Sequence, residues 1–107
     1  MMKILINNQT IFLDKANNPF KRFFGLMGKK NIKNGIYFPK CNSIHTFFMK
    51  EEIDVIMIDN DKKIVLIKEN VKRNKVIYKK EAYHTIELPK NTINNKLTLG
   101  ETLTIID

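Results

Sequence analysis

Short runs of β-branched and aromatic residues, separated by turn-forming residues, constrain the fold of this chain more than any other feature. Runs of about four to eight such residues, bounded by Asn, Asp, Gly or Pro, are typical of strands. They predict a set of about eight short strands. The candidate ranges are 3–7, 10–14, 35–38, 43–49, 53–58, 63–69, 76–78, 84–88 and 102–106.

Turn signals join some of these strands into hairpins. Asn8-Gln9 separates the first two runs, and Asn60-Asp61-Lys62 separates 53–58 from 63–69. Asparagine and aspartate tolerate left-handed backbone and cap turns with their own side chains. Many short strands with frequent turns favour a mainly β fold, either a β-sandwich or a flattened barrel. At 107 residues the chain predicts a single domain over 1–107, without a linker or an internal repeat.

One segment carries a helical pattern, at about 19–30. Asn17 or Asn18 can cap it, Pro19 suits its first turn, and apolar residues recur at spacings of three and four. The apolar positions are Phe20, Phe23, Phe24 and Met27. We expect one short helix whose apolar face covers one end of the sheet.

The chain is basic, with a formal net charge of +8. Clustered cations gain affinity for nucleic acid by displacing counterions from phosphates. Here nearly all of the charge is lysine, and Arg22 and Arg73 are the only guanidinium groups. Because specific recognition favours arginine's planar fork, we expect nonspecific nucleic-acid binding at most.

Other features bear on compartment and assembly. No window reaches the roughly 18 apolar residues that cross a bilayer, and the first residues turn polar too soon for a signal peptide. Cys41 is the only cysteine, which excludes an internal disulfide and fits a reducing compartment. We therefore expect a cytoplasmic protein, either monomeric or weakly homodimeric, with no membrane span.

Most groups capable of chemistry lie between residues 39 and 59. Cys41, His45 and Met49 are spaced by four, which on a helix would form a soft metal-ligand set. Residues 43–48 favour a strand instead, on which these side chains would spread over roughly 13 Å per five residues. We therefore predict neither a metal site nor a cofactor. Cys41 with His45 or His84 is also a conceivable nucleophile and base, although no third orienting group is identifiable.

Asp54 stands among apolar neighbours in the run 53–58, so a buried carboxylate there needs a partner. Arg22, on the predicted helix, is our choice, because a guanidinium can bind a carboxylate through two parallel hydrogen bonds. This pair would either clasp the helix to the sheet or contact a ligand. We expect His45 to line a concave site beside Met49 and near Asp54, with Cys41 at the rim.

These motifs together resemble the bacterial and archaeal family named domain of unknown function 192. Its pattern is Arg-x-x-Gly-Leu-Met, then a strand ending in Met, then a hydrophobic strand containing Asp. The matching positions are Arg22, Gly25, Leu26, Met27, Met49, Asp54, Asp59, Glu87, Pro89 and Gly100. Lys90-Asn91 departs from the family, which usually has a small residue and glycine there.

The resemblance implies a mainly β sandwich with a short helix and no established activity, and many relatives are exported. Two function classes follow. The first is a nonenzymatic binding module for a small polar ligand or a protein partner, with Arg22, His45, Met49, Asp54 and Cys41 as candidate ligand contacts. The alternative is a small hydrolase or transferase that uses His45 with Cys41 or Asp54. We favour the binding module, because the chain has no recognisable cofactor site.

Overall fold

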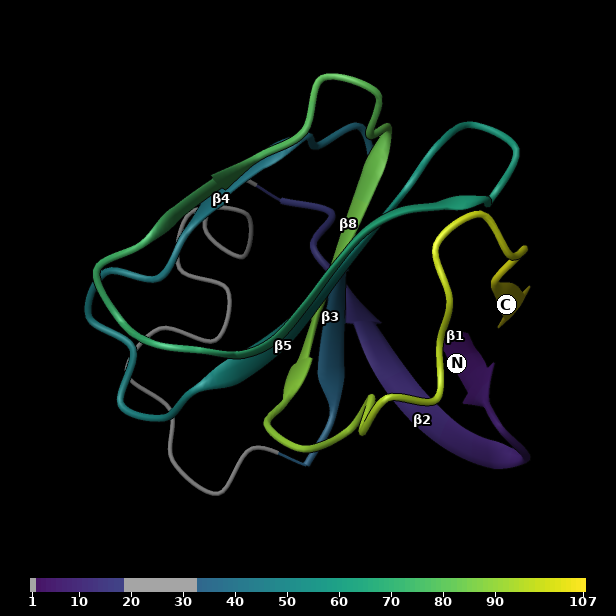
Figure 1. The fold of residues 1–107 in the computed structure, drawn as a ribbon, viewed down its shortest axis with the longest axis horizontal. Coiled ribbons are helices and arrows are strands. Elements are labelled where there is room, and N and C mark those ends of the chain that lie inside the picture. The colour runs from purple at the N-terminus through teal and green to yellow at the C-terminus, as the bar shows by residue number, and fades with distance from the viewer. Residues whose placement is uncertain (1, 19–32) are drawn as a thin grey trace.

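The computed structural model describes residues 2–18 and 33–107, and within these ranges the chain is built from strands (Figure 1). The strands are β1 (Met2–Ile6), β2 (Gln9–Lys15), β3 (Gly35–Phe38), β4 (Ser43–His45), β5 (Ile53–Ile58), β6 (Ile64–Val71), β7 (Val76–Tyr78), β8 (His84–Pro89) and β9 (Thr104–Ile106). The mainly β fold predicted from the sequence is confirmed. The helix expected at 19–30 lies outside the described residues.

Seven strands form one sheet in the order β6-β5-β8-β3-β2-β1-β9, and β4 pairs with β7 in a separate two-stranded sheet. The larger sheet curls so that its two ends meet. Ile64 N–H, just inside β6, donates to Glu101 O at 2.9 Å, and Gly100 N–H donates back to Ile64 O at 2.8 Å. Leu103 N–H donates to Lys62 O at 2.9 Å. Residues 100–103, which precede β9, thus connect the opposite edges of a half-barrel.

The first hairpin turns one residue earlier than the sequence predicts. Its turn residues are Asn7 (φ 47°) and Asn8 (φ 70°), with Ile6 paired to Gln9. Two successive left-handed residues define the turn that matches the twist of a two-residue hairpin, and asparagine adopts this conformation more readily than glutamine. Gln9 therefore begins β2 instead of occupying the turn.

The second hairpin is confirmed between β5 and β6. Asp59 Oδ1 accepts hydrogen bonds from the N–H groups of Asp61 and Lys63 at 2.8 and 2.9 Å, and Lys62 is left-handed (φ 65°). By contrast, the run expected over 43–49 forms a strand only as far as His45. The left-handed backbone of Phe48 (φ 62°) turns the chain away from extended structure.

Apolar side chains pack on both faces of the central strands. The first core cluster lies between the curled sheet and the segment 93–103, and its buried members are Met2, Ile4, Ile6, Ile11, Leu13, Tyr37, Ile56, Ile58, Ile64, Ile86, Leu88, Ile93 and Leu103. The second includes Ile44 of β4 and Ile77 of β7, and its other buried members are Ala16, Ile36, Phe38, Met49, Ile53, Val55, Met57 and Ala82. Every residue of β5 is buried, which explains why the strand is apolar throughout except at Asp54.

β3 fits between β2 and β8 because its first residue is glycine. A Cβ atom on Gly35 would lie 2.6 Å from the backbone oxygen of Glu87 and less than 3.0 Å from the side chains of Leu13 and Leu88. Any side chain at this position would therefore push the central strands apart.

Candidate functional site

Asp54 is fully buried, and its carboxylate is bound by backbone amides. Oδ1 accepts from Asn70 N–H at 2.8 Å, and Oδ2 accepts from the N–H groups of Thr92 and Ile93 at 2.9 and 2.8 Å. These bonds hold the end of β6 and the turn after β8 against β5. The sequence indicated that a buried carboxylate here needs partners, and three backbone N–H groups fill that role.

Lys90-Asn91, where the DUF192 pattern usually has a small residue and glycine, lies in the turn after β8. Asn91 is left-handed (φ 62°), as its side chain permits. Its N–H donates to Asn70 Oδ1, and its Oδ1 accepts from Asn70 Nδ2, both at 3.1 Å. This reciprocal pair lies directly beside the Asp54 bonds. Arg22, the partner predicted for Asp54 from the sequence, lies outside the described residues.

His45 and Cys41 each bond to their own chain neighbours. His45 Nδ1 accepts from Phe47 N–H at 3.2 Å, and the imidazole stacks on the Phe47 ring with centroids 5.1 Å apart. Cys41 Sγ donates to Ser43 O at 3.2 Å. Cys41 lines a hollow of about 330 Å³, which it shares with Lys40, Asn42, Ala82 and Tyr83.

His84, not His45, is the histidine beside Lys40 and Cys41. Its Nδ1 accepts from the backbone N–H of Lys40 at 3.1 Å, and its ring contacts Tyr37 and Tyr83. Burial, and then the charge of Lys40, lower the pKa of His84 below its ordinary value of 6.5. The neutral imidazole is therefore the form that fits the fold, because a protonated Nδ1 could not accept the Lys40 bond.

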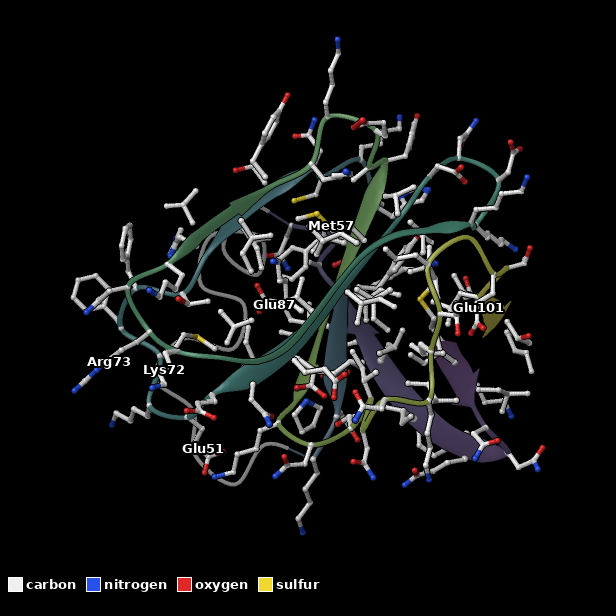
Figure 2. All side chains as sticks on the ribbon, viewed as in Figure 1. Glu51, Met57, Lys72, Arg73, Glu87 and Glu101 are labelled. Atoms are coloured by element: carbon white, nitrogen blue, oxygen red, sulfur yellow. The ribbon has the colours of Figure 1, made fainter. Side chains whose placement is uncertain are left out.

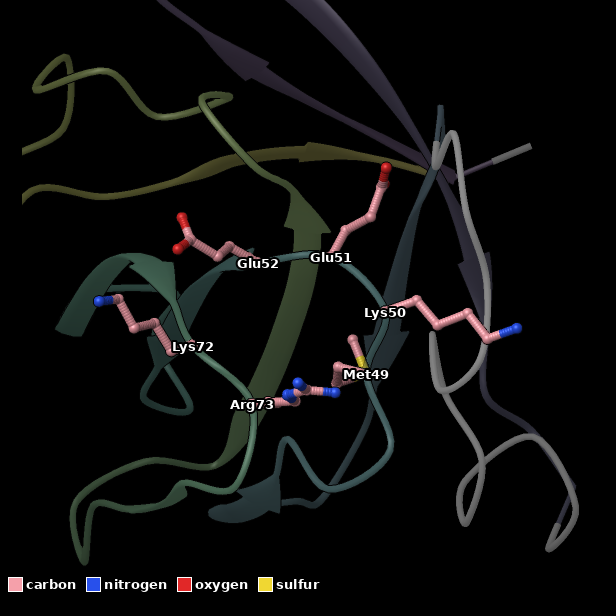
Figure 3. A pocket seen from close by; sticks show the side chains of 6 residues that line it. All are labelled: Met49, Lys50, Glu51, Glu52, Lys72 and Arg73. Atoms are coloured by element: carbon pink, nitrogen blue, oxygen red, sulfur yellow. The ribbon is translucent and has the colours of Figure 1, made fainter.

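A cavity rich in charged side chains lies beside Met49, where the chain leaves β4 and enters β5 (Figure 3). It has a volume of about 460 Å³ and is lined by Met49, Lys50, Glu51, Glu52, Lys72 and Arg73. Figure 3 shows the Arg73 guanidinium directed toward Met49. Glu51 and Glu52 follow one another along a different rim, and Lys50 points away from the other side chains. In Figure 2 the labelled Glu51, Lys72 and Arg73 gather at one end of the molecule, opposite Glu101.

None of the five charged side chains of this cavity forms an ion pair within 4.0 Å with another described residue. Among residues 2–18 and 33–107, the one ion pair with nitrogen and oxygen within 4.0 Å joins Lys15 Nζ to Asp107 Oδ2 at 2.7 Å. Neither residue lines the cavity. The cavity thus presents the carboxylates of Glu51 and Glu52 and the cations of Lys72 and Arg73, none of which is in an ion pair with another described residue, whereas Lys50 points away from them.

Thr46 holds the two walls of the cavity together. It is fully buried, and its hydroxyl donates to Lys72 O at 2.7 Å while accepting from Lys75 N–H at 2.9 Å. Its own N–H donates to Lys75 O at 2.8 Å, and its carbonyl accepts from Asn74 N–H at 3.2 Å. One side chain and its peptide groups therefore position residues 72–75 against the segment that carries Met49, Glu51 and Glu52.

Of the described residues predicted as ligand contacts, the structure brings Met49 to this cavity. Cys41 lines a different hollow, and Asp54 is enclosed by backbone amides. In the sequence, Glu51, Glu52 and Arg73 stood out only as charges. The predicted hairpin could have located them, because pairing of Ile53 with Val71 places the residues before β5 opposite those after β6.

Two absences hold for the described part of the chain. No group of three His, Cys, Asp or Glu side chains in it comes together as metal ligands. None of its segments forms a helix long and apolar enough to span a membrane.

The sequence matches the model of the family DUF192, described as "Uncharacterized ACR, COG1430", over residues 2–105. The chain belongs to this family. Two relatives are named as UPF0127 proteins: UPF0127 protein TK1120 of Thermococcus kodakarensis is 38% identical over 84 residues, and a UPF0127 protein of Thermococcus sibiricus is 35% identical over 85. The matches cover 73% and 74% of this chain but 54% and 55% of those proteins, so they span about half of each relative.

Solved structures share the DUF192 fold seen here. One from Sinorhizobium meliloti, named a "putative transcription regulator", has a TM-score of 0.80 and 19% identity, covering 96% of this chain and 90% of that chain. Another, a protein of unknown function from Novosphingobium aromaticivorans, has a TM-score of 0.75 and 13% identity, covering 96% and 82%. At these identities the likeness concerns the fold alone.

Proposed function

We propose that this chain is a nonenzymatic binding module whose cavity beside Met49 takes a small ligand carrying both a cationic and an anionic group. The observation that carries this proposal is the lining itself: Glu51, Glu52, Lys72 and Arg73, which form no ion pair with one another within 4.0 Å, line one space of about 460 Å³. That volume lies in the range of small-molecule sites.

The roles of the lining residues follow from their chemistry. Arg73 and Lys72 bind the anionic end, and the planar guanidinium of Arg73 suits a carboxylate or a phosphate. Glu51 and Glu52 accept hydrogen bonds from the ligand's ammonium group. Met49, which is buried, supplies a polarisable apolar floor between the two. A ligand with only one charge would leave half of this lining solvated.

The contacts of the other candidates favour binding over nucleophilic catalysis. The hydrogen bonds of Cys41 Sγ and His45 Nδ1 described above run to chain neighbours two residues away, and the Asp54 carboxylate accepts three backbone amides. None of these bonds joins His45 to Cys41 or to Asp54. A general base must reach the group that it deprotonates, by direct contact or through one water.

The proposal is tested with a panel of free amino acids and dipeptides, each compared with its N-acetylated and its amidated form. Binding is measured by isothermal titration and by the shift in melting temperature. We expect the doubly charged form to bind and each singly charged form to bind at least about tenfold more weakly, because each loses one charged contact.

Substitutions in the cavity give the second arm. Arg73→Gln and Glu52→Gln should each weaken binding about tenfold or more, while the matched exposed changes Lys96→Gln and Glu101→Gln leave it unchanged. Equal effects of cavity and control changes would refute the site. Chemical turnover of a ligand from the panel that is lost in Cys41→Ser, with the fold intact, would support the enzyme alternative instead.

A further inference from the structure

The two-stranded sheet of β4 and β7 has one covered face and one exposed face. Ile44 and Ile77, paired across the strands, are buried against the second core cluster. The flanking pairs, His45 with Val76 and Ser43 with Tyr78, alternate to the opposite face. In Figure 1, β7 is the green segment that runs beside β4 at the outside of the molecule.

The outer edge of β7 carries peptide groups directed away from its partner. Lys79 N–H donates to Asn42 O at 3.1 Å and Thr46 N–H donates to Lys75 O at 2.8 Å, which fixes the hydrogen-bonded pairs of the antiparallel ladder. Because such pairs alternate, the N–H and C=O groups of Val76 and Tyr78 point outward. Among the described residues, no strand pairs with this edge.

Apolar side chains accompany this edge. Val76 is 65% exposed and Tyr78 60%, and both project from the same face of β7. Phe47 and Phe48 follow the end of β4. The Phe48 side chain is 76% exposed, and its backbone φ is 62°. A bulky residue with positive φ is uncommon and is seen where the surrounding structure over-determines it.

The charge around the edge has one sign. Residues 74–80 contain Lys75, Lys79 and Lys80 and no acidic residue. These cations stand on both sides of Val76-Ile77-Tyr78, so a strand laid along β7 would have its own side chains opposite them. The edge therefore repels a second copy of itself and attracts a strand with acidic side chains.

We propose that β7 is a docking edge for an extended acidic segment of a partner protein, which adds to the β4–β7 sheet as a third strand. The partner's backbone bonds the outward N–H and C=O groups of Val76 and Tyr78, its apolar side chains contact the side chains of these two residues, and its carboxylates face the flanking cations. This is the geometry of strand addition, in which the main chain supplies affinity and alternate side chains supply specificity.

Single-stranded nucleic acid could use the same cations and aromatic faces, but it would leave the main-chain donors and acceptors of the edge unused. An extended acidic peptide uses the main-chain groups, the apolar side chains and the cations of this surface together. The docking edge is separate from the proposed ligand cavity, because it lies in β7 and neither Val76 nor Tyr78 lines the cavity.

The test uses a fluorescein-labelled octapeptide of alternating glutamate and valine, titrated with the whole chain and followed by anisotropy. A matched peptide carries N-methyl groups on alternate residues, which removes the strand-forming N–H groups and leaves the side chains unchanged. We expect N-methylation to weaken binding at least about tenfold, since it removes several hydrogen bonds. Amide chemical shifts should move at Val76 and Tyr78 and not at Glu51 or Glu52.

Variants of the edge complete the test. Val76→Pro removes one outward N–H without touching the ladder to β4, and should weaken binding about tenfold, whereas Val76→Thr keeps that N–H and should stay within about twofold. The double change Lys79→Gln/Lys80→Gln should flatten the salt dependence. Equal affinity for the N-methylated peptide, absence of binding at about 1 mM peptide, or tighter binding of an oligothymidylate that displaces the peptide would each overturn the proposal.

Discussion

Replacing Asp54 with alanine should be among the most damaging single changes in the described chain. The substitution removes the acceptor of three backbone N–H groups at a residue with no exposed surface. The N–H of Ile93 would remain buried, whereas those of Asn70 and Thr92 lie nearer the surface and can reach water. A buried amide left without an acceptor costs about 1–3 kcal/mol, and each of the other two about 1 kcal/mol.

Together these three losses predict a decrease of about 3–5 kcal/mol in the free energy of unfolding. With an unfolding entropy of about 2.1 cal/mol/K per residue, a loss of about 4 kcal/mol in this chain lowers the melting temperature by about 18 °C. Asp54→Asn keeps one carbonyl oxygen for Thr92 and Ile93 but turns an N–H₂ toward Asn70. We expect it to lose about half as much.

The assay is chemical and thermal unfolding followed by circular dichroism, with Asp59→Ala as the matched control. Asp59 also accepts two backbone N–H bonds, from Asp61 and Lys63, but in an exposed turn where water can replace it. Its removal should cost about 1 kcal/mol or less. If Asp54→Ala melts within about 5 °C of the parent, or no lower than Asp59→Ala, then burial of the amides does not set the stability lost at this position.

Three further changes test other contacts. Gly35→Ala should cost about 1–3 kcal/mol in unfolding experiments, because its Cβ meets the Glu87 oxygen at 2.6 Å, whereas Gly100→Ala meets no atom within 4 Å and is strained only by its φ of 89°. Thr46→Val keeps the shape but strands Lys75 N–H, so it should lower stability by about 1–3 kcal/mol and increase hydrogen exchange over residues 72–75. Because the folded pKa of His84 lies below 6.5, the unfolded state takes up a proton first as the pH falls. The free energy of unfolding should therefore decrease from about pH 6.5 down to the folded pKa and then level off. His84→Gln should lack this decrease, and an identical pH profile of stability in both proteins would contradict the role of His84.

The strands could be predicted because burial left a local pattern. β5 is apolar throughout except at Asp54 since both of its faces are covered, and the Asp59–Lys63 turn has the residues that such a turn requires. The limits of β4 could not be predicted from propensity, because phenylalanine favours strands whereas Phe48 has a left-handed backbone with a φ of 62°. The family resemblance was confirmed by the match over residues 2–105.

The candidate site was harder to predict, for a physical reason. Asp54 was correctly identified as needing a partner, but backbone amides have no sequence signature, so the three donors from Asn70, Thr92 and Ile93 could not be foreseen. The cavity depends on charges contributed by two segments about twenty residues apart. Their meeting follows from hairpin register, a quantity that a one-residue slip would change.

The closure of the half-barrel has a kinetic consequence. β1 pairs with β9, so that Lys3 lies opposite Ile106, and residues 100–103 bond to the start of β6. Contacts between residues so distant in sequence form only after a long loop has closed, and the entropy of that closure is lost before the contact stabilises anything. The β5–β6 and β1–β2 hairpins are local and can form early, in about 1–10 μs. The seam between β1 and β9 should therefore be the slow step of folding, and the first part of the sheet to open under force.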